Sequence, residues 1–78
     1  MSIKRSKEVN KHLSNIEAAK DFFEEMQSTR QESFDNKSEK WQEGEKGAEE
    51  QENLDAIEEI VSSLDDTHTN IDNLFEEL

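Results

Sequence analysis

The apolar positions of the last thirty-one residues recur in alternating steps of three and four, with one histidine among them. They are Leu54, Ile57, Val61, Leu64, His68, Ile71, Phe75 and Leu78. This spacing places the side chains along one side of an α-helix. We therefore predict a helix over residues 48–78 that packs on a partner helix. A run of poor helix formers predicts a kink or restart at residues 65–70.

A second apolar stripe occupies the first part of the chain and predicts a helix over residues 2–31. Its members are Val9, Leu13, Ile16, Ala19, Phe23 and Met26. Phe22 widens this stripe, and Ile60 and Leu74 widen the later one, so each apolar side is broader than a two-stranded coiled coil needs. The pattern predicts an all-α antiparallel helical hairpin with a short middle helix or loop, assembled as a helical-bundle homo-oligomer.

The composition makes self-association the expected route to stability. Of the 78 residues, 29% are hydrophobic, 38% are charged and none is cysteine. A single domain of this size buries little apolar surface, and no disulfide can compensate. We see neither a signal sequence nor an apolar stretch of membrane-spanning length. We therefore expect one cytoplasmic domain over residues 1–78, without membrane contact.

The charge distribution favours antiparallel pairing of the two predicted helices. Residues 1–20 carry a net charge of +3 and residues 48–78 carry −11, within a total of −12. Exposed ion pairs add little stability, but they select the orientation of two helices. Glu58, Asp65 and Asp72 follow one another at heptad spacing beside the apolar stripe. Two copies of this acidic helix repel each other unless helices with basic residues alternate with them.

The connecting segment, residues 33–47, holds the only tryptophan and both glycines. We predict a short helix within it, because Asp35 or Asn36 is a suitable N-cap and glycine often ends a helix. Gly44 or Gly47 is the expected end. The segment also gathers aromatic, basic and polar residues of the kind found in interface hot spots.

The predicted partner- or ligand-binding residues lie in and just before this segment. They are Arg30, Phe34, Lys37, Ser38, Lys40, Trp41 and Gln42. Lys37 and Trp41 are four residues apart and share a helix face, and Phe34 is placed to pack on Ser38 or Trp41. Trp41 fits equally a core that closes the hairpin and an exposed interface.

Residues 34–47 fit the pattern F-D-x-[RK]-S-E-K-W-Q-E-x-E-K-G. This stretch resembles a motif that recurs in small uncharacterised proteins encoded by bacteriophages. Lys37 stands where the motif has arginine, and Gly44 stands where it has serine. The resemblance covers fourteen of the 78 residues and brings no established activity with it. It implies a phage origin and an action on the bacterial host.

Several kinds of chemistry are not expected from these residues. The absence of cysteine excludes thiolate zinc sites and cysteine nucleophiles. The residues from Asp66 to Glu77 approximate the spacing of a calcium loop, but Ile71 stands where that loop needs glycine. His12 and His68 are expected as polar groups beside the helix contact rather than as metal ligands. We therefore expect no enzyme activity, no metal and no cofactor.

Three binding functions remain, with a non-enzymatic, phage-encoded inhibitor of a host defence protein favoured. The first alternative is an oligomeric sponge that sequesters a signalling nucleotide such as a cyclic dinucleotide. The bases of the nucleotide would stack on Trp41 and Phe34. Its phosphates would be held by Arg30, Lys37, Ser38 and Lys40. The second alternative is a DNA mimic in which Glu58, Asp65 and Asp72 replace phosphates. Direct nucleic-acid binding is not expected for so acidic a chain.

Overall fold

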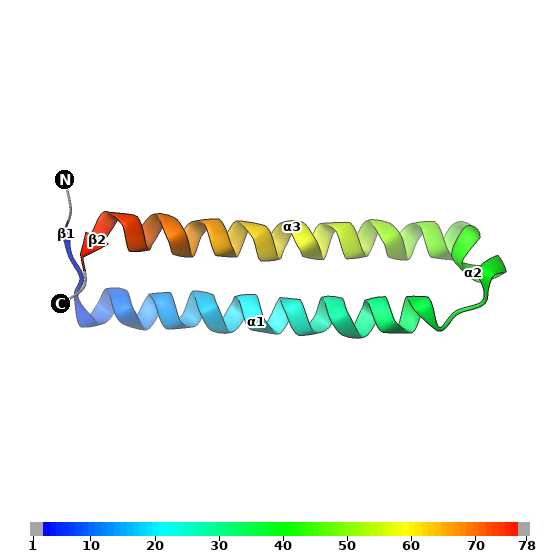
Figure 1. The fold of residues 1–78 in the computed structure, drawn as a ribbon, viewed down its shortest axis with the longest axis horizontal. Helices are drawn as coiled ribbons and strands as arrows, with labels where there is room; N and C mark the ends of the chain where they lie inside the picture. Colours follow the sequence, from blue (N-terminus) through cyan, green and yellow to red (C-terminus); the bar gives the residue numbers. More distant parts are fainter. Residues whose placement is uncertain (1–2, 77–78) are drawn as a thin grey trace.

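The computed structural model describes residues 3–76 and forms a rod measuring 55 × 19 × 12 Å, in which two long helices lie antiparallel (Figure 1). The helices are α1 (Lys7–Asp35), α2 (Glu39–Glu43) and α3 (Glu45–Leu74), and the strands are β1 (Ile3–Lys4) and β2 (Phe75–Glu76). The predicted all-α hairpin with a short middle helix is confirmed. The two short strands are the only non-helical elements among the described residues, and they lie at the end of the rod opposite the turn.

The long helices begin and end at residues different from those predicted. Ser6 caps the start of α1, where its side-chain oxygen accepts a hydrogen bond of 3.2 Å from the backbone N–H of Val9. The residues before it are extended, so the first helix does not reach back toward residue 2. α1 continues to Asp35, and α3 starts at Glu45, so the connection is shorter than residues 33–47. The predicted bounds Ser2 and Leu78 lie outside the described residues.

The predicted kink at residues 65–70 is absent, because α3 runs without interruption to Leu74 (Figure 1). Packing against α1 explains this continuity. Leu64 and His68 are half-buried on the side that faces α1, and Asp65 forms an ion pair of 3.0 Å with Lys20 of α1. Tertiary contacts of this kind override weak intrinsic helix propensity.

The contact between α1 and α3 uses the two predicted stripes. Leu13, Leu54 and Ile57 form the most buried part and are 5%, 2% and 8% exposed. The other described stripe residues are half-buried, as an apolar side facing a single partner helix requires. Phe22 and Ile60, which widen the stripes in sequence, remain 59% and 40% exposed. The hairpin therefore covers the centre of each apolar side and leaves one edge open.

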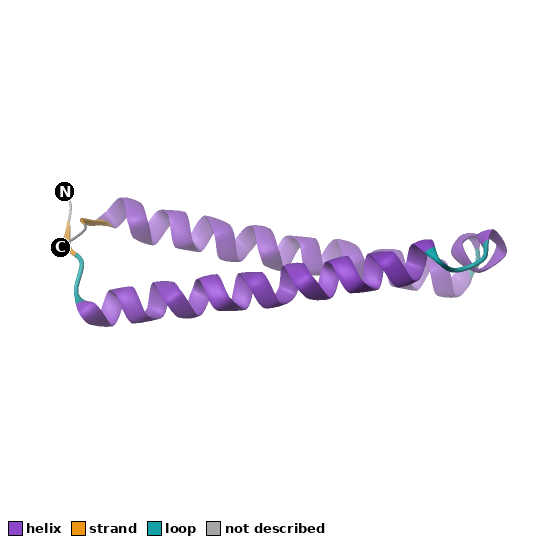
Figure 2. Ribbon diagram, turned by 60° about the horizontal axis from the view of Figure 1, so that its bottom comes forward, coloured by secondary structure: helices purple, strands orange, loops and turns teal. Residues whose placement is uncertain are grey.

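At the end opposite the turn, β1 and β2 pair in parallel, with Ile3 opposite Phe75. Arg5 follows β1 and forms an ion pair of 2.6 Å with Asp72 near the end of α3. Figure 2 shows from another side that α1 and α3 cross at a shallow angle along the rod. Within the described residues, no helix combines the length and the apolar character needed to cross a membrane.

The burial of Leu54 predicts a large loss of stability on truncation. Leu54→Ala should lower the free energy of unfolding by about 2–5 kcal/mol, because it leaves a cavity where the helices meet. Leu74→Ala is the matched control, since Leu74 is 45% exposed and its truncation should cost less than about 1 kcal/mol. Urea titration followed by circular dichroism measures both. Equal losses would contradict the assignment of Leu54 to the core.

Candidate functional site

The predicted binding residues lie at or near the turn end of the hairpin, where Ser38 begins the short helix α2. Ser38 is the N-cap of α2, and its side-chain oxygen accepts a hydrogen bond of 3.2 Å from the backbone N–H of Trp41. The predicted N-caps Asp35 and Asn36 are wrong. α1 extends to Asp35, and Asn36 forms its C-cap, so neither residue is available to start another helix. The side-chain oxygen of Ser38 thus acts as an acceptor within the fold, which leaves its O–H able to donate.

Gln42 ties the end of α1 to α2. Its side-chain amide donates hydrogen bonds to the backbone carbonyls of Phe34, at 2.9 Å, and Lys37, at 3.1 Å. These carbonyls belong to the last turn of α1 and the bend after it, beyond the regular i→i+4 hydrogen bonds of the helix. Gln42 is half-buried and therefore acts on the turn rather than presenting its amide to a ligand.

Gly47 is required by close packing rather than by a helix end. Gly44 ends α2 as predicted, at φ −83°, and also caps the start of α3. Gly47 lies in the first turn of α3 and is buried. A Cβ atom there would overlap the backbone carbonyl of Gln42 and lie 2.6 Å from the carbonyl oxygen of Trp41. The backbones of α2 and α3 can approach this closely only because residue 47 has no side chain.

Trp41 is half-buried and held from two sides. Its ring meets Phe34 edge to face, with centroids 6.0 Å apart, as predicted for this pair. The ammonium nitrogen of Lys37 lies 5.3 Å from the centroid of the indole ring, which is within cation–π range. Trp41 therefore closes the turn and still presents part of its surface to solvent.

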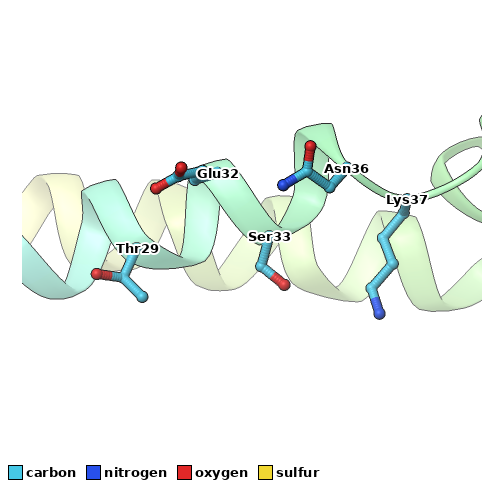
Figure 3. A pocket seen from close by; sticks show the side chains of 5 residues that line it. All are labelled: Thr29, Glu32, Ser33, Asn36 and Lys37. Carbon is cyan, nitrogen blue, oxygen red and sulfur yellow. The ribbon is translucent and has the colours of Figure 1, made fainter.

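Two hollows meet beside Trp41. One has a volume of about 360 Å³ and is lined by Ser33, Lys37, Trp41, Lys46, Glu49, Glu50 and Asn53. The other, of about 390 Å³, follows the end of α1 and shares Ser33 and Lys37 with the first. In Figure 3, Thr29, Ser33 and Lys37 project to one side of α1, while Glu32 and Asn36 project to the other. Both hollows are shallow and mix acidic with basic groups.

Arg30 is not a free cation beside these hollows, because it is paired with Glu50 of α3. Its guanidinium donates hydrogen bonds of 3.1 and 2.7 Å to the two carboxylate oxygens of Glu50. These bonds hold the pKa of Glu50 below its ordinary value and raise the pKa of Arg30. The pair joins α1 to α3 one helical turn beyond the start of α3.

The predicted acidic residues divide into two paired carboxylates and one that faces solvent. Asp65 pairs with Lys20, and Asp72 pairs with both Arg5 and His68. Glu58 is exposed in a shallow hollow on α3 that is lined by Asp55, Glu58, Glu59, Ser62 and Ser63. The two paired residues thus help to hold the hairpin together.

The structure adds residues that the sequence interpretation missed. Lys46 and Asn53 line the hollow beside Trp41, but they lie at the start of α3, outside the predicted binding set. The antiparallel register was the signal that could have found them, since it sets the start of α3 beside the end of α1. Lys40 is exposed on α2. Across residues 3–76, no cluster of three or more histidine, aspartate or glutamate side chains is arranged to hold a metal ion.

The two glycines predict opposite responses to the same substitution. Gly47→Ala should lower the free energy of unfolding by about 3 kcal/mol or more, because the new methyl group meets backbone atoms that cannot move aside cheaply. Gly44→Ala should change it by no more than about 1 kcal/mol, since its Cβ would lie 3.3 Å from the nearest atom. Thermal unfolding followed by Trp41 fluorescence reads out the turn directly. A tolerated Gly47→Ala would refute this packing.

The lowered pKa of Glu50 predicts a pH-dependent contribution to stability. A carboxylate with a depressed pKa stabilises the fold above its unfolded pKa, and this contribution disappears as pH falls through its folded pKa. Glu50→Gln should therefore destabilise the hairpin at pH 7, and the difference from wild type should shrink below about pH 4. Urea midpoints between pH 3 and 7 measure the difference. Glu52→Gln, which removes an exposed carboxylate nearby, should show no such dependence.

Comparison of the chain with protein-family models, with curated proteins and with solved structures found no match.

Proposed function

We propose that the chain is a non-enzymatic binding protein of phage origin that inhibits a host defence protein by stoichiometric contact. The observation that carries the proposal is a half-buried tryptophan at the turn end of the hairpin, where Phe34 and Lys37 contact its ring. Ser38, Gln42 and Gly47 fix the backbone around Trp41, so little conformational entropy remains to be lost on binding.

The chemistry around Trp41 supports a protein partner. An aromatic anchor within a polar, mixed-charge rim is the usual composition of an interface hot spot. Here the rim includes Lys37 and Lys46 as well as Glu49, and the hollows are too shallow to enclose a small molecule. A protein surface with its own mixed charges matches such a rim better than a compact anion does.

The two alternatives have less support in the contacts. A nucleotide sponge was expected to hold phosphates partly through Arg30, but Arg30 is paired with Glu50. DNA mimicry was expected to use Asp65 and Asp72, which pair with basic residues of the same hairpin. The sponge therefore lacks one of the free groups it requires, and the DNA mimic lacks two.

We also propose that the working form is a homo-oligomer. Only three apolar side chains among the described residues are buried, and such a small core provides limited stability for one copy. Association with further copies would cover the apolar side chains that the single hairpin leaves open.

A charge reversal beside Trp41 tests the binding proposal. Tagged wild-type protein should capture a bacterial protein from lysate in a fixed ratio, and Lys46→Glu should reduce this capture about tenfold or more. Lys11→Glu, an equal charge change on an exposed residue near the start of α1, should capture as wild type does. Quantitative mass spectrometry of the bound fractions makes the comparison.

Three outcomes contradict the proposal. Equal capture by both variants would show that the contact lies away from Trp41. No capture by wild type would contradict the existence of a protein partner. Heat released on titration with cyclic dinucleotides, together with a thermal shift, would favour the nucleotide sponge instead.

A further inference from the structure

One broad side of the hairpin carries no charged side chain along its middle, and we call it the neutral face. Its central members are Asn15, Phe22 and Met26 of α1 with Ala56, Ile60 and Thr67 of α3. The large apolar side chains exposed here, those of Phe22 and Ile60, are the ones that widen the two stripes in sequence.

Helical geometry places these residues on the same side of the rod. An α-helix turns about 100° per residue, so positions on either edge of a buried stripe can be assigned from sequence. Lys20 and Asp65 are rotated in one sense from the stripe, and their ion pair shows that these edges adjoin. Phe22 and Ile60 are rotated in the opposite sense on their respective helices. They therefore share the other side of the hairpin.

The members of the neutral face also lie level with one another along the rod. Counted from the pair formed by Arg30 and Glu50, Phe22 is eight residues back on α1 and Ile60 is ten residues forward on α3. These separations are about 12 and 15 Å, well within one helical turn of each other. The same register sets Asn15 level with Thr67.

The opposite side, which we call the acidic face, carries Glu17, Glu24, Glu58, Asp65 and Asp72. Two copies of a chain with net charge −12 repel each other wherever such groups meet. The neutral face is the side on which a second copy can approach without placing like charges opposite each other.

We propose that the neutral face binds the same face of a second copy through a two-fold axis parallel to the rod. Rotation about this axis leaves each residue at the same position along the rod and sets α1 of each copy against α3 of the other. Phe22 of each copy therefore lies opposite Ile60 of the other. Beside Ile60 is a hollow of about 510 Å³ lined by Ala56, Glu59, Ile60, Ser63, Leu64 and Thr67. The aromatic ring of Phe22 from the second copy occupies this hollow.

The resulting four-helix bundle has antiparallel neighbours all round. Every acidic α3 then lies between two copies of α1, which carries Lys7, Lys11, Lys20 and Arg30 and is less acidic than α3. This alternation relieves the repulsion that adjacent copies of α3 would suffer. The surfaces are self-complementary, as an isologous contact requires.

The available area is close to the lower limit expected of a specific dimer. The uncharged stretches of the two helices lie level with each other over residues 15–29 of α1 and 53–67 of α3, a length of about 21 Å at 1.5 Å per residue. With the width of 19 Å, each copy offers a projected area of about 400 Å². Accessible area exceeds projected area on a ridged surface, so the area buried on the two copies together is comparable with the ~1,000 Å² expected of a specific interface.

This inference rests on the proposed homo-oligomer and adds a consequence for binding. Because the axis is parallel to the rod, both turn ends lie at the same end of the dimer. A partner with two equivalent sites would meet two Trp41 surfaces at once, which raises the effective affinity without any new contact.

Light scattering coupled to gel filtration tests the dimer. Wild-type protein should have twice the 9.1 kDa mass of the chain. Phe22→Glu should weaken association more than about tenfold, because it places a carboxylate in the apolar contact. Ser62→Glu adds the same charge to an exposed position on the acidic side of α3 and should leave the dimer intact. A monomeric wild type would overturn both the oligomer and this inference.

Cysteine cross-linking tests the arrangement in protein that keeps Phe22. The chain has no cysteine, so any disulfide formed must involve the introduced residues. A mixture of Asn15→Cys and tagged Thr67→Cys should form mixed disulfide dimers, identified by mass, whereas Ser62→Cys should form none. A dimer that resists Phe22→Glu and gives no mixed disulfide would refute the neutral face while leaving the oligomer standing.

Discussion

The hairpin depends on one narrow contact between two long helices. Leu13, Leu54 and Ile57 are the buried centre of that contact, and half-buried residues extend it in both directions along the rod. Because a two-helix contact has only one covered side, the rest of each helix must be polar or must find another surface. The high charge of the chain and its open apolar edge are both consequences of this geometry.

The sequence was sufficient to predict the pairing of the helices but not their ends. Periodicity placed Leu54 and Val61 correctly, because a buried stripe repeats over many turns. The ends depended on single hydrogen bonds and contacts, such as those of Ser6 and Ser38, which have no periodic signal. The prediction of a kink at residues 65–70 was wrong, because packing against α1 outweighs the weak intrinsic helix propensity of these residues.

The connecting segment forms the turn of the hairpin as predicted, but the contacts of its residues were only partly predicted. The contacts of Trp41 with Phe34 and Lys37 follow from helical spacing. The roles of Gln42 and Gly47 depend on how α2 folds against its neighbours, which the local sequence does not specify.

The parallel pairing of β1 and β2 has a consequence for the topology of the chain. It brings Ile3 beside Phe75 at the tip farthest from Trp41. A short linker could therefore join the termini into a circular polypeptide without crossing the helices. New ends could then be opened elsewhere, and closure would restrict the unfolded chain more than the folded one.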